Sequence, residues 1–176
     1  MTKAADLPPA RRPDGPYRVA IVCLGNICRS PIANVVLRRA LERAGLAERV
    51  EVESSGTGDW HLGHPMDRRA AAALAAAGYD GSEHRAQQFT ERWFAEHDLI
   101  LAMDQSNYRD IAALAPDEET AKERVRMFRE YDPHAEYADL EVPDPYYGGD
   151  DGFAHVLRIV ERTSAGLADA LVEHLS

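Results

Sequence analysis

The 176-residue sequence has few cysteines, a shortage of positive charge and no long apolar run. Its only cysteines are Cys23 and Cys28, too few for a disulfide framework, so we expect a reducing, cytoplasmic compartment. No apolar stretch is long enough to span a bilayer, and the N-terminus lacks the apolar segment of a signal peptide. These features predict a protein that does not associate with membranes, although leaderless export stays open.

The charge balance narrows the possible partners. Lysine and arginine number 20 against 30 aspartate and glutamate residues, which gives a net charge of −10. Nucleic-acid binding rewards basic surfaces, so this balance argues against a nucleic-acid partner. It does not exclude a small anionic ligand, because a local dipole and one arginine can outweigh distant acidic groups. We expect a monomer or a weak dimer.

The chain divides into a tail and one domain. Residues 1–16 hold four prolines and show no apolar periodicity, so they predict a flexible N-terminal tail. Arg11 and Arg12 could form a docking element there, but a solvated tail is the simpler interpretation. The remaining residues, 17–176, are long enough for a single domain with a hydrophobic core.

Strand and helix signals alternate along this domain. Strands are expected at 17–22, 50–54, 98–103 and 124–128. Helices are expected from Ser30-Pro31 to Gly45, at 65–77, from the third strand to residue 114, from about 117 and at 150–175. Such alternation predicts an α/β domain with a four-stranded parallel sheet and helices on both faces. Ligands of these folds bind at the carboxyl ends of the strands.

The loop between the first strand and the first helix carries the strongest chemical signal. It reads CLGNICRS, so Cys23 and Arg29 flank a turn whose N–H groups can surround an oxyanion. Gly25 and Asn26 tolerate the unusual backbone angles of a tight turn. Arg29 can bind two phosphate oxygens. The helix dipole and this guanidinium should lower the pKa of the Cys23 thiol far below the usual value of about 8.5.

Residues 22–31, VCLGNICRSP, resemble the signature of the low-molecular-weight protein tyrosine phosphatases. Further segments are similar to that family: SSGTGDW at 54–60, DRRA at 67–70, AMDQSN at 102–107 and DPYYG at 144–148. The resemblance covers residues 17–176, and GTGDWH at 56–61 points to bacterial members of actinobacterial type. It implies a flavodoxin-like, phosphotyrosine phosphatase I-like fold.

The resemblance also implies a set of site residues. Catalysis falls to Cys23 as nucleophile, Arg29 as phosphate ligand and Asp144 as general acid and base. The substrate would be bound by Leu24, Gly25, Asn26, Ile27, Cys28, Ser30, Trp60, Tyr146 and Tyr147, with support from Ser54, His84 and Asp104. Without the family, the Asp-Pro-Tyr-Tyr-Gly segment would most simply be a turn.

These roles define a mechanism that needs neither metal nor cofactor. Cys23 attacks phosphorus, Asp144 protonates the departing tyrosine oxygen, and water then hydrolyses a phosphocysteine intermediate. The expected substrates are tyrosine-phosphorylated proteins. Because a second cysteine lies inside the loop, we also expect that oxidised Cys23 forms a disulfide with Cys28, unless Cys28 merely packs as a small apolar residue.

Four alternative functions fit the sequence less well. An arsenate reductase of the same fold needs further cysteines for its disulfide relay, and the sequence has none. A phosphoarginine phosphatase typically has threonine where this chain has Ile27. A catalytically silent phosphate-binding module would be expected to have lost Cys23 or Asp144. A zinc site built on Cys23 and Cys28 lacks two further ligands at suitable spacing.

Overall fold

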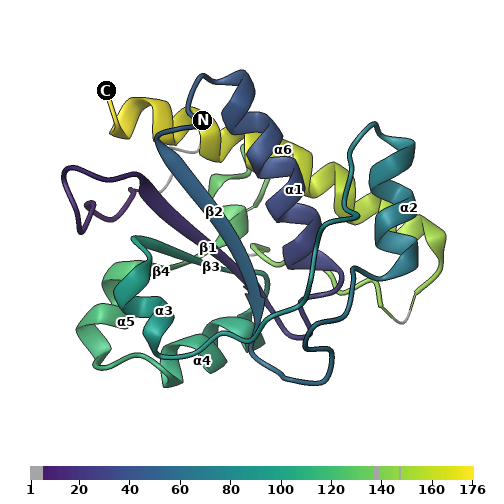
Figure 1. Cartoon of the computed structure of the whole chain (residues 1–176), viewed down its shortest axis with the longest axis horizontal. Coiled ribbons are helices and arrows are strands. Elements are labelled where there is room, and N and C mark those ends of the chain that lie inside the picture. The colour runs from purple at the N-terminus through teal and green to yellow at the C-terminus, as the bar shows by residue number, and fades with distance from the viewer. Residues whose placement is uncertain (1–5, 137–138, 147) are drawn as a thin grey trace.

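The computed structural model describes residues 6–136, 139–146 and 148–176, and it shows an α/β sandwich (Figure 1). Its elements in chain order are β1 (Tyr17–Cys23), α1 (Arg29–Arg43), β2 (Val50–Gly56), α2 (Arg68–Ala76), α3 (Arg92–Glu96), β3 (Leu99–Ala102), α4 (Gln105–Ala113), α5 (Glu118–Arg124), β4 (Val125–Met127), the 3-10 helix η1 (Phe128–Tyr131) and α6 (Asp150–His174). The four strands are parallel in the order β2-β1-β3-β4. The predicted fold class is confirmed.

Side chains that alternate along β1 face the two helical layers. Val19 and Ile21 join a core with residues of α1, α2 and α6, whereas Ala20 and Val22 join a core with residues of α3 and α4. Helices thus cover both faces of the sheet (Figure 1). Because β1 is buried on both faces, its near-continuous apolar sequence is the pattern expected of a central parallel strand.

The sequence predicts Ser30 as the N-cap of the first helix and Pro31 as its first residue, but the helix begins two residues earlier and Cys28 is its N-cap. Helix α1 starts at Arg29, after Cys28, and Pro31 lies inside the first turn. Proline is tolerated there because the first N–H groups of a helix have no intrahelical partner. The Ser30 hydroxyl is consequently available to the cysteine loop.

The segment before β1 contacts the domain. The carbonyl of Pro8 accepts a hydrogen bond from the Tyr17 hydroxyl at 2.8 Å. The backbone N–H of Arg11 donates to Asp98 at 2.7 Å, and Arg124 donates to the carbonyl of Pro9. Residues 1–5 lie outside the described residues, so the flexible tail stays a prediction, but its second half packs near the amino ends of the strands. Within the described ranges, no helix has the length and apolarity to cross a membrane.

Candidate active site

The cysteine loop lies at the carboxyl end of β1, the central strand. Cys23 is the last residue of that strand, and its Sγ lies 2.9 Å from Ser30 Oγ. The backbone N–H of Asn26 also points at Sγ, at 3.3 Å. Both contacts can donate hydrogen bonds to sulfur, and the amino end of α1 adds positive potential beside it. The surroundings of Cys23 therefore suit a bound oxyanion.

Asn26 fixes the shape of this loop from behind. Its φ of +57° is left-handed, a conformation that asparagine tolerates better than most residues. The side-chain NH₂ donates to Ser30 Oγ at 2.8 Å and to Ser54 Oγ at 3.1 Å, and Oδ1 accepts from the Gln87 N–H at 2.9 Å. Asn26 is buried, so water cannot reach its amide group, and these three bonds satisfy that group instead.

A segment without regular helix or strand supports Asn26 and the end of β2. His84 Nε2 lies 2.6 Å from the carbonyl oxygen of Asn26. A carbonyl can only accept, so Nε2 carries the proton. Burial lowers the pKa of His84 and outweighs this hydrogen bond, with nearby Arg85 acting in the same direction as burial. The ring is therefore neutral at pH 7 and serves as a hydrogen-bond donor.

The same segment, residues 84–89, runs along the last residue of β2. The Gly56 N–H donates to the Gln87 carbonyl at 2.9 Å, and the Phe89 N–H donates to the Gly56 carbonyl at 2.7 Å. Gly56 also lies directly under the cysteine loop. A Cβ at this position would lie 2.6 Å from the carbonyl oxygen of Leu24, closer than real contacts allow. The backbone of β2 thus sets the position of the loop.

Arg29 is the first residue of α1, and its guanidinium is held from two sides. Nη1 donates to Asp104 Oδ2 at 2.7 Å and to the carbonyl of Val142 at 3.0 Å, while Nη2 lies 3.6 Å from Asp144 Oδ2. Burial opposes the charge, but the negative groups at Cys23, Asp104 and Asp144 outweigh it and the pKa of Arg29 is raised. The cation is permanent and oriented.

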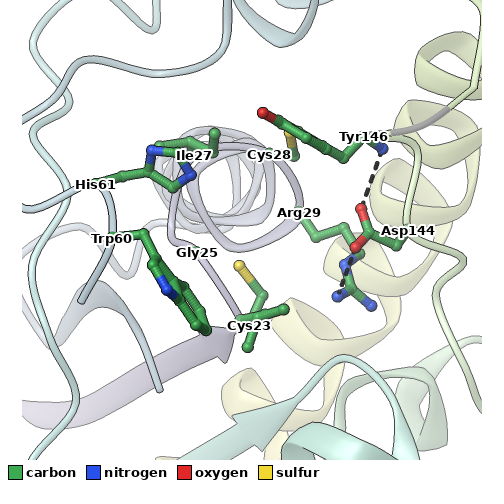
Figure 2. A pocket seen from close by; sticks show the side chains of 10 residues that line it. Cys23, Gly25, Ile27, Cys28, Arg29, Trp60, His61, Asp144 and Tyr146 are labelled. Atoms are coloured by element: carbon green, nitrogen blue, oxygen red, sulfur yellow. Dashed lines mark hydrogen bonds and ion pairs between the residues drawn. The ribbon is translucent and has the colours of Figure 1, made fainter. Parts of the chain in front are cut away.

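Asp144 faces the cysteine loop from the segment before α6 (Figure 2). Its side chain is 38% exposed, and Oδ1 accepts from the Tyr146 N–H at 3.1 Å. The carboxylate therefore lies at the mouth of the site, where it can reach an incoming group and exchange protons with water. The cysteine and the carboxylate come from segments more than a hundred residues apart.

These side chains line a pocket of about 350 Å³, in the size range of small-ligand sites (Figure 2). Its lining residues are Cys23, Leu24, Gly25, Ile27, Cys28, Arg29, Trp60, His61, Asp144 and Tyr146. The Trp60 ring stands on one side and the Tyr146 ring on another, and both remain exposed. Two aromatic walls above a polar floor suit a flat ring that carries an anionic group.

The structure places the expected residues in three positions. The lining residues above include every predicted catalytic residue and most of the predicted substrate-binding ones. Asn26, Ser30, Ser54 and His84 lie behind the loop, and Asp104 lies behind Arg29. Tyr147 lies outside the described residues. Among the described residues, no group of three or more metal-ligating side chains gathers.

His61 was missed by the sequence analysis. It lines the pocket, its ring centre lies 6.5 Å from that of Tyr146, and a Cβ at Gly25 would lie 3.1 Å from its ring. Its only signal in the sequence is its place beside Trp60. Gln87 was also missed, because an exposed-looking glutamine gives no sign that its backbone supports a loop sixty residues away.

The fold and the site together define a class of protein. A cysteine, an arginine and N–H groups around one oxyanion site, with a carboxylate at the mouth, are groups that suit the binding and cleavage of a phosphate ester. The family model described as "Low molecular weight phosphotyrosine protein phosphatase" matches residues 18–176. The chain belongs to this family, as predicted, and is a phosphatase enzyme.

Individual relatives agree with this assignment. The low molecular weight protein-tyrosine-phosphatase of Streptomyces coelicolor is 50% identical over 90% of this chain and 96% of its own length. The low molecular weight protein-tyrosine phosphatase A of Mycobacterium tuberculosis is 40% identical over 92% of this chain and 95% of its own length. A protein tyrosine phosphatase structure from Entamoeba histolytica superposes with a TM-score of 0.84 at 31% identity, over 91% and 99% of the two chains.

Proposed function

We propose that the protein hydrolyses phosphotyrosine in proteins through a phosphocysteine intermediate on Cys23. One observation carries the proposal: Cys23, Arg29 and Asp144 line a single pocket whose sides are the rings of Trp60 and Tyr146. The floor suits a phosphate group, and the sides suit the phenyl ring that links it to a peptide. A phosphoserine side chain is too short to occupy both parts.

Substrate binding uses the positive floor of the pocket. The phosphate oxygens take hydrogen bonds from the loop N–H groups and from Arg29, whose orientation Asp104 already fixes. The phenyl ring lies between Trp60 and Tyr146. Phosphorus is then held above Cys23 Sγ in a geometry suited to in-line attack.

The reaction proceeds in two displacements. The Cys23 sulfur forms a bond to phosphorus while the bond to the tyrosine oxygen breaks, and Asp144 gives its proton to that oxygen. A water molecule then attacks phosphorus through its oxygen, and Asp144, now ionised, accepts a proton from that water. The S–P bond breaks, and the Ser30 hydroxyl, 2.9 Å from Sγ, donates a hydrogen bond to the departing sulfur.

Two related activities are disfavoured by particular residues. The apolar side chain of Ile27 lines the pocket, and a phosphoarginine phosphatase of this family typically has threonine there. An arsenate reductase would need a further cysteine, and the sequence has only Cys23 and Cys28. Both alternatives retain the same loop, so substrate tests separate them from the proposal.

Oxidation of the nucleophile is a further part of the proposal. Cys28 lines the same pocket as Cys23, and both cysteines are unpaired. We propose that peroxide oxidises Cys23 to its sulfenic acid and is itself reduced to water. The Cys28 sulfur then attacks the Cys23 sulfur, the S–OH bond breaks, and a disulfide forms as the hydroxyl leaves as water. Burial is the main cause that raises the pKa of Cys28, and the charges of Asp67, Cys23 and Asp144 raise it further. The thiol form of Cys28 therefore predominates, and formation of the disulfide is slow.

The proposed function is tested by a substrate panel on three proteins. Wild type should cleave phosphotyrosine peptides far faster than matched phosphoserine or phosphoarginine peptides. Cys23→Ser should remove turnover while it preserves folding and phosphate binding, and Cys28→Ser should keep substantial activity. Comparable rates on phosphoserine, or near wild-type turnover by Cys23→Ser, would refute the assignment.

A further inference from the structure

Arg69 connects helix α2 to the loop that carries Asp144. It is the second residue of α2, yet its Nη2 donates to the carbonyl of Tyr146 at 2.7 Å and its Nη1 donates to the carbonyl of Gly148 at 3.0 Å. These carbonyls follow Asp144 by two and four residues. One guanidinium therefore binds the backbone of the Asp144 loop at two points, across 77 and 79 residues of chain.

Asp67 holds this guanidinium in place and links it to the cysteine loop. Its Oδ1 accepts from Arg69 Nε at 3.3 Å, and its Oδ2 lies at the same distance from Arg69 Nη2. The Asp67 backbone N–H donates to the Ile27 carbonyl at 2.9 Å. Burial opposes ionisation of Asp67, but the hydrogen bonds from Arg69 outweigh it and the pKa of Asp67 is lowered. A continuous chain of contacts thus joins the nucleophile loop to the acid loop.

Two aromatic rings fix the plane of the Arg69 guanidinium. Its central carbon lies 4.7 Å from the centre of the Phe153 ring and 5.7 Å from the centre of the Tyr146 ring. Phe153 is buried in the core at the start of α6, so it gives the cation a rigid base. Lysine could not reproduce this arrangement, because an ammonium has no plane to stack and cannot bind two carbonyls and Asp67 in one fixed fork.

Among the described residues, the carboxylate of Asp144 is held by two long contacts. Its carboxylate is partly exposed and contacts the Tyr146 N–H and Arg29, and the Arg29 contact must loosen when phosphate binds. The bonds from Arg69 to the following backbone involve neither Arg29 nor the Asp144 carboxylate, so binding of phosphate at Arg29 does not compete with them.

We propose that Arg69 is a positioning residue that holds the Asp144 loop over the pocket, so that the carboxyl group reaches the leaving oxygen. The proposal rests on the general-acid role proposed for Asp144. If Arg69 only stabilised helix α2, its replacement would reduce the rates on both esters equally. Helix α2 is capped by Asp67 Oδ1 through the backbone N–H of Arg69, a contact that glutamine or lysine at position 69 leaves in place.

The test compares Arg69→Gln and Arg69→Lys with Arg68→Gln, a matched change at the exposed neighbouring arginine. Each protein is assayed on phosphotyrosine and on an aryl phosphate whose phenol is more acidic. Both Arg69 variants should lose about 10–100-fold in kcat on phosphotyrosine and much less on the activated ester, with KM nearly unchanged. Arg68→Gln should match wild type. Thermal unfolding of all variants verifies that they fold.

A double-mutant cycle decides between positioning and structure. In an Asp144→Ala background, Arg69→Gln should cause no further loss of kcat, because the group that it positions is already gone. Equal losses on both esters, or a full second loss in the Asp144→Ala background, would overturn the positioning role. If Asp144→Ala itself shows no dependence on the leaving group, the general-acid role fails, and the positioning role falls with it. A normal Asp144→Ala result beside an inert Arg69→Gln refutes the positioning role alone.

Discussion

Oδ2 of Asp144 lies 3.6 Å from Nη2 of Arg29, so the proposed acid contacts the cation that would bind phosphate. The side chain of Asp144 is partly exposed, and its contact with Arg29 is longer than the 2.7 Å contact between Arg29 and Asp104. An entering phosphate can therefore replace the carboxylate on Arg29 at small cost. We expect the released carboxyl group of Asp144 to turn toward the leaving oxygen, where the proposed mechanism needs its proton.

Removal of the carboxyl group should reveal its role as the acid. Tyrosine is a poor leaving group, with a phenol pKa near 10. Asp144→Ala should slow phosphotyrosine cleavage by roughly 10²–10⁴-fold and slow an activated aryl phosphate less. Steady-state kinetics on both substrates measure the difference. Equal losses would mean that Asp144 only shapes the loop.

The second cysteine should protect the first against irreversible oxidation. After brief peroxide treatment, wild type should regain activity with dithiothreitol, because the Cys23–Cys28 disulfide is reducible. Cys28→Ser has no resolving thiol, so prolonged treatment should inactivate it permanently. Mass spectrometry detects the intramolecular disulfide. Equal recovery of both proteins without that disulfide would leave Cys28 as a packing residue.

Asn26 allows the cost of its backbone angle to be separated from the cost of its hydrogen bonds. Asn26→Gly removes the bonds to Ser30, Ser54 and Gln87 but tolerates a φ of +57°, and it should lower the free energy of unfolding by about 2–4 kcal/mol. Asn26→Ala loses the same bonds and adds the strain of left-handed backbone. It should be less stable than the glycine variant by about 1 kcal/mol. Chemical denaturation of the three proteins measures both differences, and equal stability of the two variants would contradict the strain.

His84 should make stability fall in mild acid. Its pKa is lowered by burial, so below about pH 6.5 the unfolded chain binds a proton that the folded ring resists. The unfolded state then carries more protons, and the free energy of unfolding decreases as pH falls through and below that value. His84→Gln can still donate to the Asn26 carbonyl but does not titrate. Denaturation at pH 7.5 and 5.5 should show a smaller decrease for this variant than for wild type; identical decreases would exclude His84 as the source.

Long periodic or apolar segments were the easiest parts of the fold to predict. The apolar run at residues 17–23 and the apolar stripe of α6 can be recognised from the local sequence alone. The predicted strands and long helices lie within a few residues of the observed ones. Helix α3 was missed because its five residues complete little more than one turn, and its Trp93 and Phe94 are as typical of strands as of helices. Tertiary packing of these two rings on the sheet, and not local propensity, makes the segment helical.

The site residues likewise divide into those that the local sequence identifies and those that only the three-dimensional fold brings together. The cysteine loop is a local motif, so its residues could be named from the sequence, and the placement of Asp144 followed from the family resemblance. Contacts that depend on the three-dimensional fold left no local trace: Gln87 acts through its backbone, Val142 through its carbonyl, and His61 through its position beside Gly25. Arg69 lay inside a segment already noted, but its partners at residues 146 and 148 could be found only in space.

Because residues 84–89 support the cysteine loop, hydrogen exchange in this segment can measure how often the loop opens. The amide hydrogen of Gln87 is occupied by Asn26 Oδ1, although it belongs to neither a helix nor a strand. Solvent deuterium can replace it only when the loop and its support separate, so its exchange rate reports the opening of the phosphate site itself. An oxyanion bound above Cys23 should hold the loop closed and slow this exchange. The exchange rate of a single amide, on the opposite side of the loop from Cys23, would then measure how often the site opens.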